Sequence, residues 1–70
     1  MANLPNAAER LVTSVRARLR EEKRSVAWLA SEIGANPSTV RYQLARPSAL
    51  SFANGYAIAT RLGLPMGDAA

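Results

Sequence analysis

The chain has 70 residues, contains no cysteine and no histidine, and carries a net charge of +4 from nine basic and five acidic residues. This length suits a single domain over residues 1–70, and the missing residue types exclude disulfides, thiolate zinc sites and triad-type catalysis. We therefore expect no enzyme activity, no cofactor and no metal. The positive charge favours a polyanionic partner, with nucleic acid ahead of anionic lipid.

Neither a membrane span nor a signal peptide is predicted. No apolar run approaches the roughly 18 residues that a span requires. The first residues lack a basic segment followed by an apolar one. We expect a cytoplasmic protein that has no membrane partner.

Four segments carry helical signals and none shows the alternation typical of strands, so the predicted fold class is all-α. The first predicted helix covers about residues 7–23. It begins with Asn6 and Glu9, which are spaced as a capping box. Apolar residues then recur every four positions from Leu11 to Leu19. A solvated charged face is expected from Arg16, Arg20 and Lys23 or Arg24, with Glu21 and Glu22 between them.

The second predicted helix covers residues 26–33. Ser25 is its expected cap, and Gly34 stands where a left-handed residue would end it. Trp28 lies outside the apolar face of this helix, which Val26, Leu29 and Ile33 form. We expect its large side chain to contact the core or a second subunit, with DNA contact as the lesser alternative.

The third predicted helix covers residues 37–45. Asn36 is its expected cap, and a proline at the first position gives up an N–H that has no partner there. Val40 and Leu44 are expected to point inward. The outward residues are then Ser38, Thr39, Arg41, Tyr42 and, at the edge, Gln43.

A loop is expected over residues 46–49, and a fourth helix over residues 52–62. Ser51 is its expected cap, and Leu50 precedes the cap where it can pack on the first turn. Gly55 lies inside this helix, where a glycine costs roughly 1 kcal/mol of stability relative to alanine. A close crossing with another helix would explain why a glycine stands there. The apolar surface of this helix is expected to comprise Phe52, Ala53, Tyr56, Ala57, Ala59 and Leu62.

Two short helices joined by a tight turn over residues 34–36 are what a helix-turn-helix requires. The short turn makes the second helix project from the protein surface. A helix 10 to 12 Å across matches a major groove about 12 Å wide. The spacing therefore predicts a DNA-binding element over about residues 25–45.

The stretch from Ser25 to Val40 resembles the lambda-repressor-like family, also called Cro/C1-type or XRE. The shared features are Leu29-Ala30 in the first helix of the motif, Ile33-Gly34 at its end and Val40 in the second helix. The likeness continues through residues 56–59 and 62–64 and covers about residues 10–66. It implies a compact domain of four to five helices.

The resemblance also implies roles for individual residues. Arg41 is the strongest candidate for base readout, since its guanidinium fork matches guanine O6 and N7. Tyr42 is expected either to stack on DNA or to pack beneath the following loop, and Asn36 either to cap its helix alone or also to touch a phosphate. The base-readout candidates are Pro37, Ser38, Thr39, Arg41 and Tyr42. The phosphate candidates are Arg24, Ser25, Asn36, Arg46, Ser48 and Asn54.

The chain departs from the family pattern at two places. Val26 stands where the family often has glutamine, which removes a common phosphate contact. The glutamate-arginine-glycine run that often follows the recognition helix is replaced by residues 44–47, so the course of that loop is open.

The resemblance implies a sequence-specific regulator of transcription, of the compact phage or prophage Cro-like type, that represses by occupying its operator. Its expected partners are a double-stranded, palindromic DNA operator and a second copy of the chain, in a weak homodimer or a pair formed on DNA. One alternative is a protein-interaction module, an anti-repressor or adaptor, anchored by Trp28, Tyr42 and Met66. Another is an excisionase-like architectural DNA binder.

Overall fold

A computed structural model of the chain describes residues 6–65. Over this range the chain forms four α-helices and one turn of 3₁₀ helix. No strand occurs within residues 6–65, so the prediction of an all-α fold class is confirmed. The elements are α1 (Ala7–Glu22), α2 (Val26–Ile33), α3 (Pro37–Ala45), η1 (Pro47–Ala49) and α4 (Phe52–Leu62).

Helices α2, α3 and α4 have the predicted bounds, because the residues at their ends supply the predicted caps. The side chains of Ser25, Asn36 and Ser51 each accept a hydrogen bond from a backbone N–H of the turn that follows. Gly34 and Gly63 end α2 and α4 in the left-handed region, with φ of 72° and 68°. Capping satisfies N–H and C=O groups that have no partner inside the helix.

Helix α1 ends one residue earlier than predicted. Its start is the predicted capping box, in which Asn6 Oδ1 accepts from Glu9 N at 2.8 Å and Glu9 Oε1 accepts from Asn6 N at 3.1 Å. Its last residue is Glu22, and Lys23 caps it in the left-handed region with φ of 56°. Glycine usually holds this position, so a lysine there gives no sequence signal for the end of the helix.

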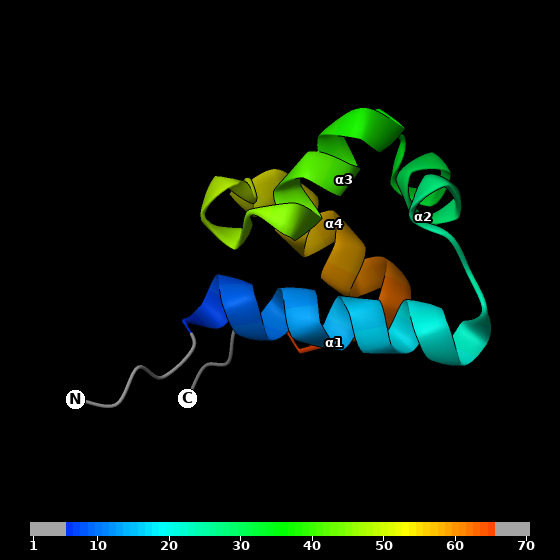
Figure 1. The fold of residues 1–70 in the computed structure, drawn as a ribbon, viewed down its shortest axis with the longest axis horizontal. Coiled ribbons are helices and arrows are strands. Elements are labelled where there is room, and N and C mark those ends of the chain that lie inside the picture. Colours follow the sequence, from blue (N-terminus) through cyan, green and yellow to red (C-terminus); the bar gives the residue numbers. More distant parts are fainter. Residues whose placement is uncertain (1–5, 66–70) are drawn as a thin grey trace.

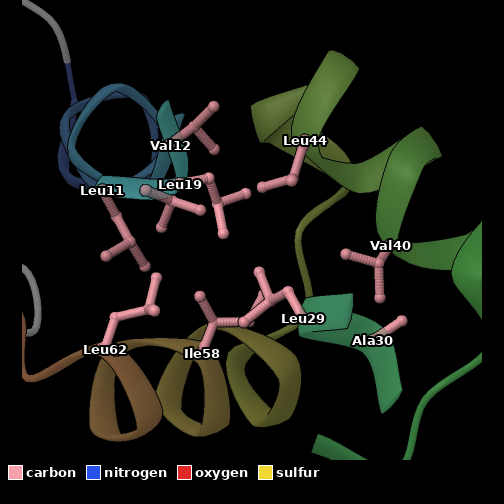
Figure 2. Packing of buried hydrophobic residues seen from close by; sticks show 11 residues of the cluster. Leu11, Val12, Leu19, Leu29, Ala30, Val40, Leu44, Ile58 and Leu62 are labelled. Carbon is pink, nitrogen blue, oxygen red and sulfur yellow. The ribbon is translucent and has the colours of Figure 1, made fainter. Parts of the chain in front are cut away.

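One apolar cluster joins the four helices (Figure 2). Side chains of α1 and α4 face each other across its centre, and those of α2 and α3 close its other side. Leu29, Ala30 and Val40 are 0% exposed. The buried members are Leu11, Val12, Val15, Leu19, Leu29, Ala30, Val40, Leu44, Ile58, Ala59 and Leu62.

Helix α3 lies at the edge of the molecule opposite α1 (Figure 1). It packs on α2 through its inner side and on η1 beyond its C-terminal end, while α4 packs on both α1 and α2. The residues predicted to form a loop therefore make a 3₁₀ turn that contacts α1 and α3. This arrangement supports α3 from one side and leaves its other side facing solvent.

The predicted apolar face of α4 is partly wrong. Phe52 and Tyr56 are 78% and 57% exposed, and their rings stack on each other outside the core. The buried face carries Gly55, Ile58, Ala59 and Leu62. Both sets recur at three- and four-residue spacing, so periodicity alone does not separate them.

Gly55 lies where α4 approaches α1. A Cβ at this position would lie 3.5 Å from Leu50 Cδ2 and 3.6 Å from Leu11 Cδ2. These are ordinary contact distances. The expected close crossing is present, and it has room for one methyl group.

No helix within residues 6–65 is long and apolar enough to cross a membrane.

Candidate nucleic-acid interface

Helices α2 and α3 are joined by a turn of three residues, Gly34 to Asn36. The turn is closed by hydrogen bonds, in which Gly34 N donates to Ser31 O and Ala35 N donates to Ala30 O at 2.9 Å. Asn36 Oδ1 then accepts from the first N–H groups of α3, at 2.8 and 3.4 Å. Every residue of the connection is thus hydrogen-bonded into one helix or the other, which fixes the direction of α3.

Only two side chains of α3 are buried in the core. Val40 is 0% exposed and Leu44 is 2% exposed, as predicted. The five side chains predicted to read bases are all exposed and are brought together on the outer side of this one helix. They are Pro37, Ser38, Thr39, Arg41 and Tyr42. A helix of this length, 9 residues, extends roughly 13 Å, which fits within one major groove.

The stretch of chain that contains α3 has basic but no acidic residues, since the sequence has no aspartate or glutamate between Ile33 and Pro65. Arg41 and Arg46 make no ion pair in the part of the chain that the structure describes, whereas Arg61 pairs with Glu32 at 2.8 Å. Their two charges are therefore available to an anion.

Tyr42 lies beside Arg46 at the C-terminal end of α3. The guanidinium carbon of Arg46 is 5.9 Å from the centroid of the Tyr42 ring, within the range of a cation–π contact. The ring of Tyr42 is 56% exposed, so it does not pack beneath the following turn. Ser48 is exposed in η1, close after Arg46 in the chain. The two predicted phosphate candidates Arg46 and Ser48 therefore lie beyond the same end of α3.

Two other phosphate candidates lie at the start of α2. Ser25 Oγ accepts from Trp28 N at 3.0 Å, so its hydroxyl caps the helix. The N–H groups of Val26 and Ala27 donate to no acceptor within residues 6–65. The guanidinium carbon of Arg24 lies 4.5 Å from the centroid of the Trp28 ring. An anion placed here would meet two free N–H groups and a stacked arginine.

The side chains of Asn36 and Asn54 form hydrogen bonds within the protein. Asn36 caps α3, which leaves no free N–H in the first turn of that helix, since residue 37 is proline. Asn54 is half-buried and donates from Nδ2 to Gln43 Oε1 at 3.0 Å. An amide nitrogen carries two hydrogens, so Asn54 keeps one donor for another partner. Gln43 was expected at the outer edge of α3 and instead ties α3 to α4.

Trp28 is half-buried and packs against the core, one of the two contacts expected of it, and its ring also contacts two arginines. Besides Arg24, the guanidinium carbon of Arg61 lies 4.9 Å from its ring centroid. Arg24 lies in the connection before Ser25 and not in α2, so its contact with Trp28 is not one between helical neighbours and leaves only a faint sequence signal. The Arg61 contact joins α2 to α4 and leaves none.

No family model matches the chain, and no curated protein or solved structure is significantly similar to it.

Proposed function

We propose that this chain is a sequence-specific double-stranded DNA-binding regulator of transcription of the lambda-repressor-like helix-turn-helix type, in which α3 reads the major groove. One observation carries the proposal. Helix α3 buries only Val40 and Leu44 and turns its five base-readout candidates outward, within a stretch of chain that has no acidic residue between Ile33 and Pro65. The three-residue turn after α2 gives the two helices the connection that this motif requires.

Base readout is assigned to the outer side of α3. Arg41 donates two hydrogen bonds to O6 and N7 of a guanine. Ser38 and Thr39 bond base edges or the flanking phosphates, and Pro37, without an N–H, contacts a thymine methyl group. Tyr42 stacks on a sugar or a thymine methyl beside Arg46. Arg41 therefore carries most of the specificity.

Phosphate contacts are assigned to both sides of α3. Arg24 and Ser25 bind one phosphate at the start of α2, and Arg46 and Ser48 bind another beyond the end of α3. Asn36 and Asn54 add hydrogen bonds from the ends of their helices. Such contacts fix the register of the protein on DNA and carry no sequence information themselves.

The proposed mode of action is repression by occupancy. Recognition helices of two copies enter successive major grooves about 34 Å apart and exclude polymerase from the promoter. The small regulators that phages encode work in this way, and we propose that this chain acts as one of them, in the cytoplasm of the host.

Binding to the DNA that precedes the chain's own gene tests this function. Fluorescence anisotropy should give an affinity at least about a thousandfold higher than for a shuffled duplex of the same composition. The affinity should fall steeply as salt rises, because each bound phosphate releases counterions. Equal affinity for the two duplexes at every salt concentration would contradict the proposal.

The exposed ring of Tyr42 also suits a second function, a protein-interaction module on the same fold. Of its other expected anchors, Trp28 is half-buried beneath two arginines, and Met66 lies outside the described residues. Such a module would bind DNA no better than any basic protein of equal charge. An excisionase-like architectural protein would bind DNA and bend it without discriminating between operators, which a circular-permutation assay measures.

A further inference from the structure

The side chain of Arg24 lies over the ring of Trp28, with its guanidinium carbon 4.5 Å from the ring centroid. Arg24 belongs to the short connection between α1 and α2, and its side chain is exposed. An exposed arginine ordinarily samples many conformers, and ordering them costs free energy. The ring therefore restricts a side chain that would otherwise move freely.

The ring of Trp28 is a fixed support. It is half-buried and packs against the apolar cluster. The backbone N–H of Trp28 donates to Ser25 Oγ at 3.0 Å, in the cap of α2. The backbone of Arg24 is fixed as well, because its N–H donates to the carbonyl oxygen of Leu19 at 2.9 Å. Both ends of the Arg24 side chain are thus held, the backbone by the end of α1 and the guanidinium by the ring.

A second arginine contacts the same ring, but its charge is already balanced. The guanidinium carbon of Arg61 lies 4.9 Å from the Trp28 centroid, and Arg61 Nε donates to Glu32 Oε1 at 2.8 Å. Arg24 makes no ion pair within residues 6–65. The carboxylate of Glu32 offsets the charge of Arg61, so the charge of Arg24 is the one left for an external anion.

We propose that Trp28 is a positioning residue for DNA binding, whose ring holds the guanidinium of Arg24 where it meets a backbone phosphate, beside the two free N–H groups of the first turn of α2. This inference rests on the proposed function, because it concerns the phosphate site assigned to the start of α2. The attraction acts on the face of the ring, so the N–H donors of Arg24 stay available to phosphate oxygens. A side chain that is ordered before binding does not have to be ordered by it.

A double-mutant cycle in DNA affinity tests this role. Trp28→Leu should weaken binding roughly two- to tenfold, since Arg24 must then be ordered on binding. The factor should be the same for every duplex, because phosphate contacts carry no sequence information. In the Arg24→Ala background, the same substitution should change the affinity by less than about twofold. An equal loss in both backgrounds would overturn the proposal, since Trp28 would then act through the fold and not through Arg24.

The double variant Glu32→Gln/Arg61→Gln is the matched control. It removes a cation from the same ring without changing the net charge, and it leaves the contact with Arg24 in place. Its affinity for DNA should stay within about twofold of that of the parent chain. A loss as large as that of Trp28→Leu would contradict the assignment of the free charge to Arg24.

Fluorinated tryptophan tests the contact even where Trp28→Leu does not fold. Trp28 is the sole tryptophan of the chain, so its incorporation alters one ring only. Fluorine withdraws electrons from the face of the ring and nearly preserves its shape, which weakens a cation–π contact. The affinity for DNA should fall in the parent chain and stay unchanged in Arg24→Ala. An unchanged affinity in the parent chain would overturn the positioning role.

NMR spectra without DNA separate this inference from the proposed function. The side-chain protons of Arg24 should be shifted upfield by the ring current of Trp28, and fluorination should reduce that shift. Unshifted Arg24 protons in a parent chain that binds DNA would reject the positioning role and leave the proposed function standing. Shifted protons in a parent chain that binds no DNA would reject the proposed function, and with it the phosphate contact that Trp28 supports.

Discussion

Asn54 donates from Nδ2 a hydrogen bond of 3.0 Å to Oε1 of Gln43. The bond joins the second half of α3 to the first turn of α4, and both side chains are half-buried. Asn54 N also donates to Ser51 Oγ at 3.1 Å, so the same residue completes the cap of α4. The position of the proposed recognition helix is thus tied to the start of α4 by one pair of amides.

Removing either side-chain amide should weaken the connection between α3 and α4. Gln43→Ala is expected to lower the free energy of unfolding by about 1 kcal/mol, because the Asn54 amide loses its acceptor. Asn54→Ala should cost a similar amount, and the double variant hardly more than either single one. Urea denaturation of the three variants measures the coupling. A double variant whose loss equals the sum of the single losses would show that the bond contributes nothing.

The salt dependence of DNA binding should count the proposed phosphate contacts. Arg24→Ala and Arg46→Ala should each reduce the slope of log affinity against log salt by about 1, and weaken binding to all duplexes alike. Arg20→Ala is the control, since Arg20 is an exposed arginine of α1 and has no assigned phosphate. An unchanged slope in either test variant would remove that arginine from the interface.

Three substitutions of Asn36 separate capping from phosphate contact. Asn36→Ala should lower the free energy of unfolding by about 1 kcal/mol, whereas Asn36→Ser and Asn36→Asp keep an oxygen that caps. The aspartate also places a negative charge beside the proposed phosphate, so it should retain stability and lose DNA affinity. Thermal unfolding and anisotropy titrations measure the two effects. Equal DNA affinity for the serine and aspartate variants would leave Asn36 with capping alone.

The same substitution at two glycines should have opposite effects. Gly55→Ala is expected to raise the free energy of unfolding by about 0.5–1 kcal/mol, because alanine favours a helix and its Cβ fits between Leu50 and Leu11. Gly34→Ala should lower it by about 1 kcal/mol, since φ of 72° is strained for alanine. Urea denaturation decides; a destabilised Gly55→Ala would mean that the α1–α4 contact is closer than described.

Helix ends were predicted best, because their signals are local. Ser25, Asn36 and Ser51 cap the helices that they were expected to cap, and Gly34 ends α2 as expected. The exposure of the readout candidates on α3 followed from Val40 and Leu44 alone, since two inward residues four apart orient a short helix. The single-domain interpretation, the DNA partner and the regulatory function stay predictions.

Contacts between residues far apart in the chain could not be predicted from the sequence. The bond between Gln43 and Asn54 and the contact of Trp28 with Arg61 both join residues from different helices. Arg18 of α1 donates to the carbonyl oxygen of Leu62 at the end of α4, a contact that the sequence did not predict. Phe52 was wrongly assigned to the apolar face of α4 for the same reason. Which face of a helix is buried depends on the helices that pack against it.

Selection of duplexes from a random DNA pool, by the parent chain and by Arg41→Ala, tests the central claim most directly. The parent chain should enrich one motif with an invariant guanine in each half-site. The variant should lose that guanine and about 1–3 kcal/mol of discrimination at that position, while the other positions persist. An enriched motif that is the same for both proteins, or no motif for the parent chain, would contradict readout by α3.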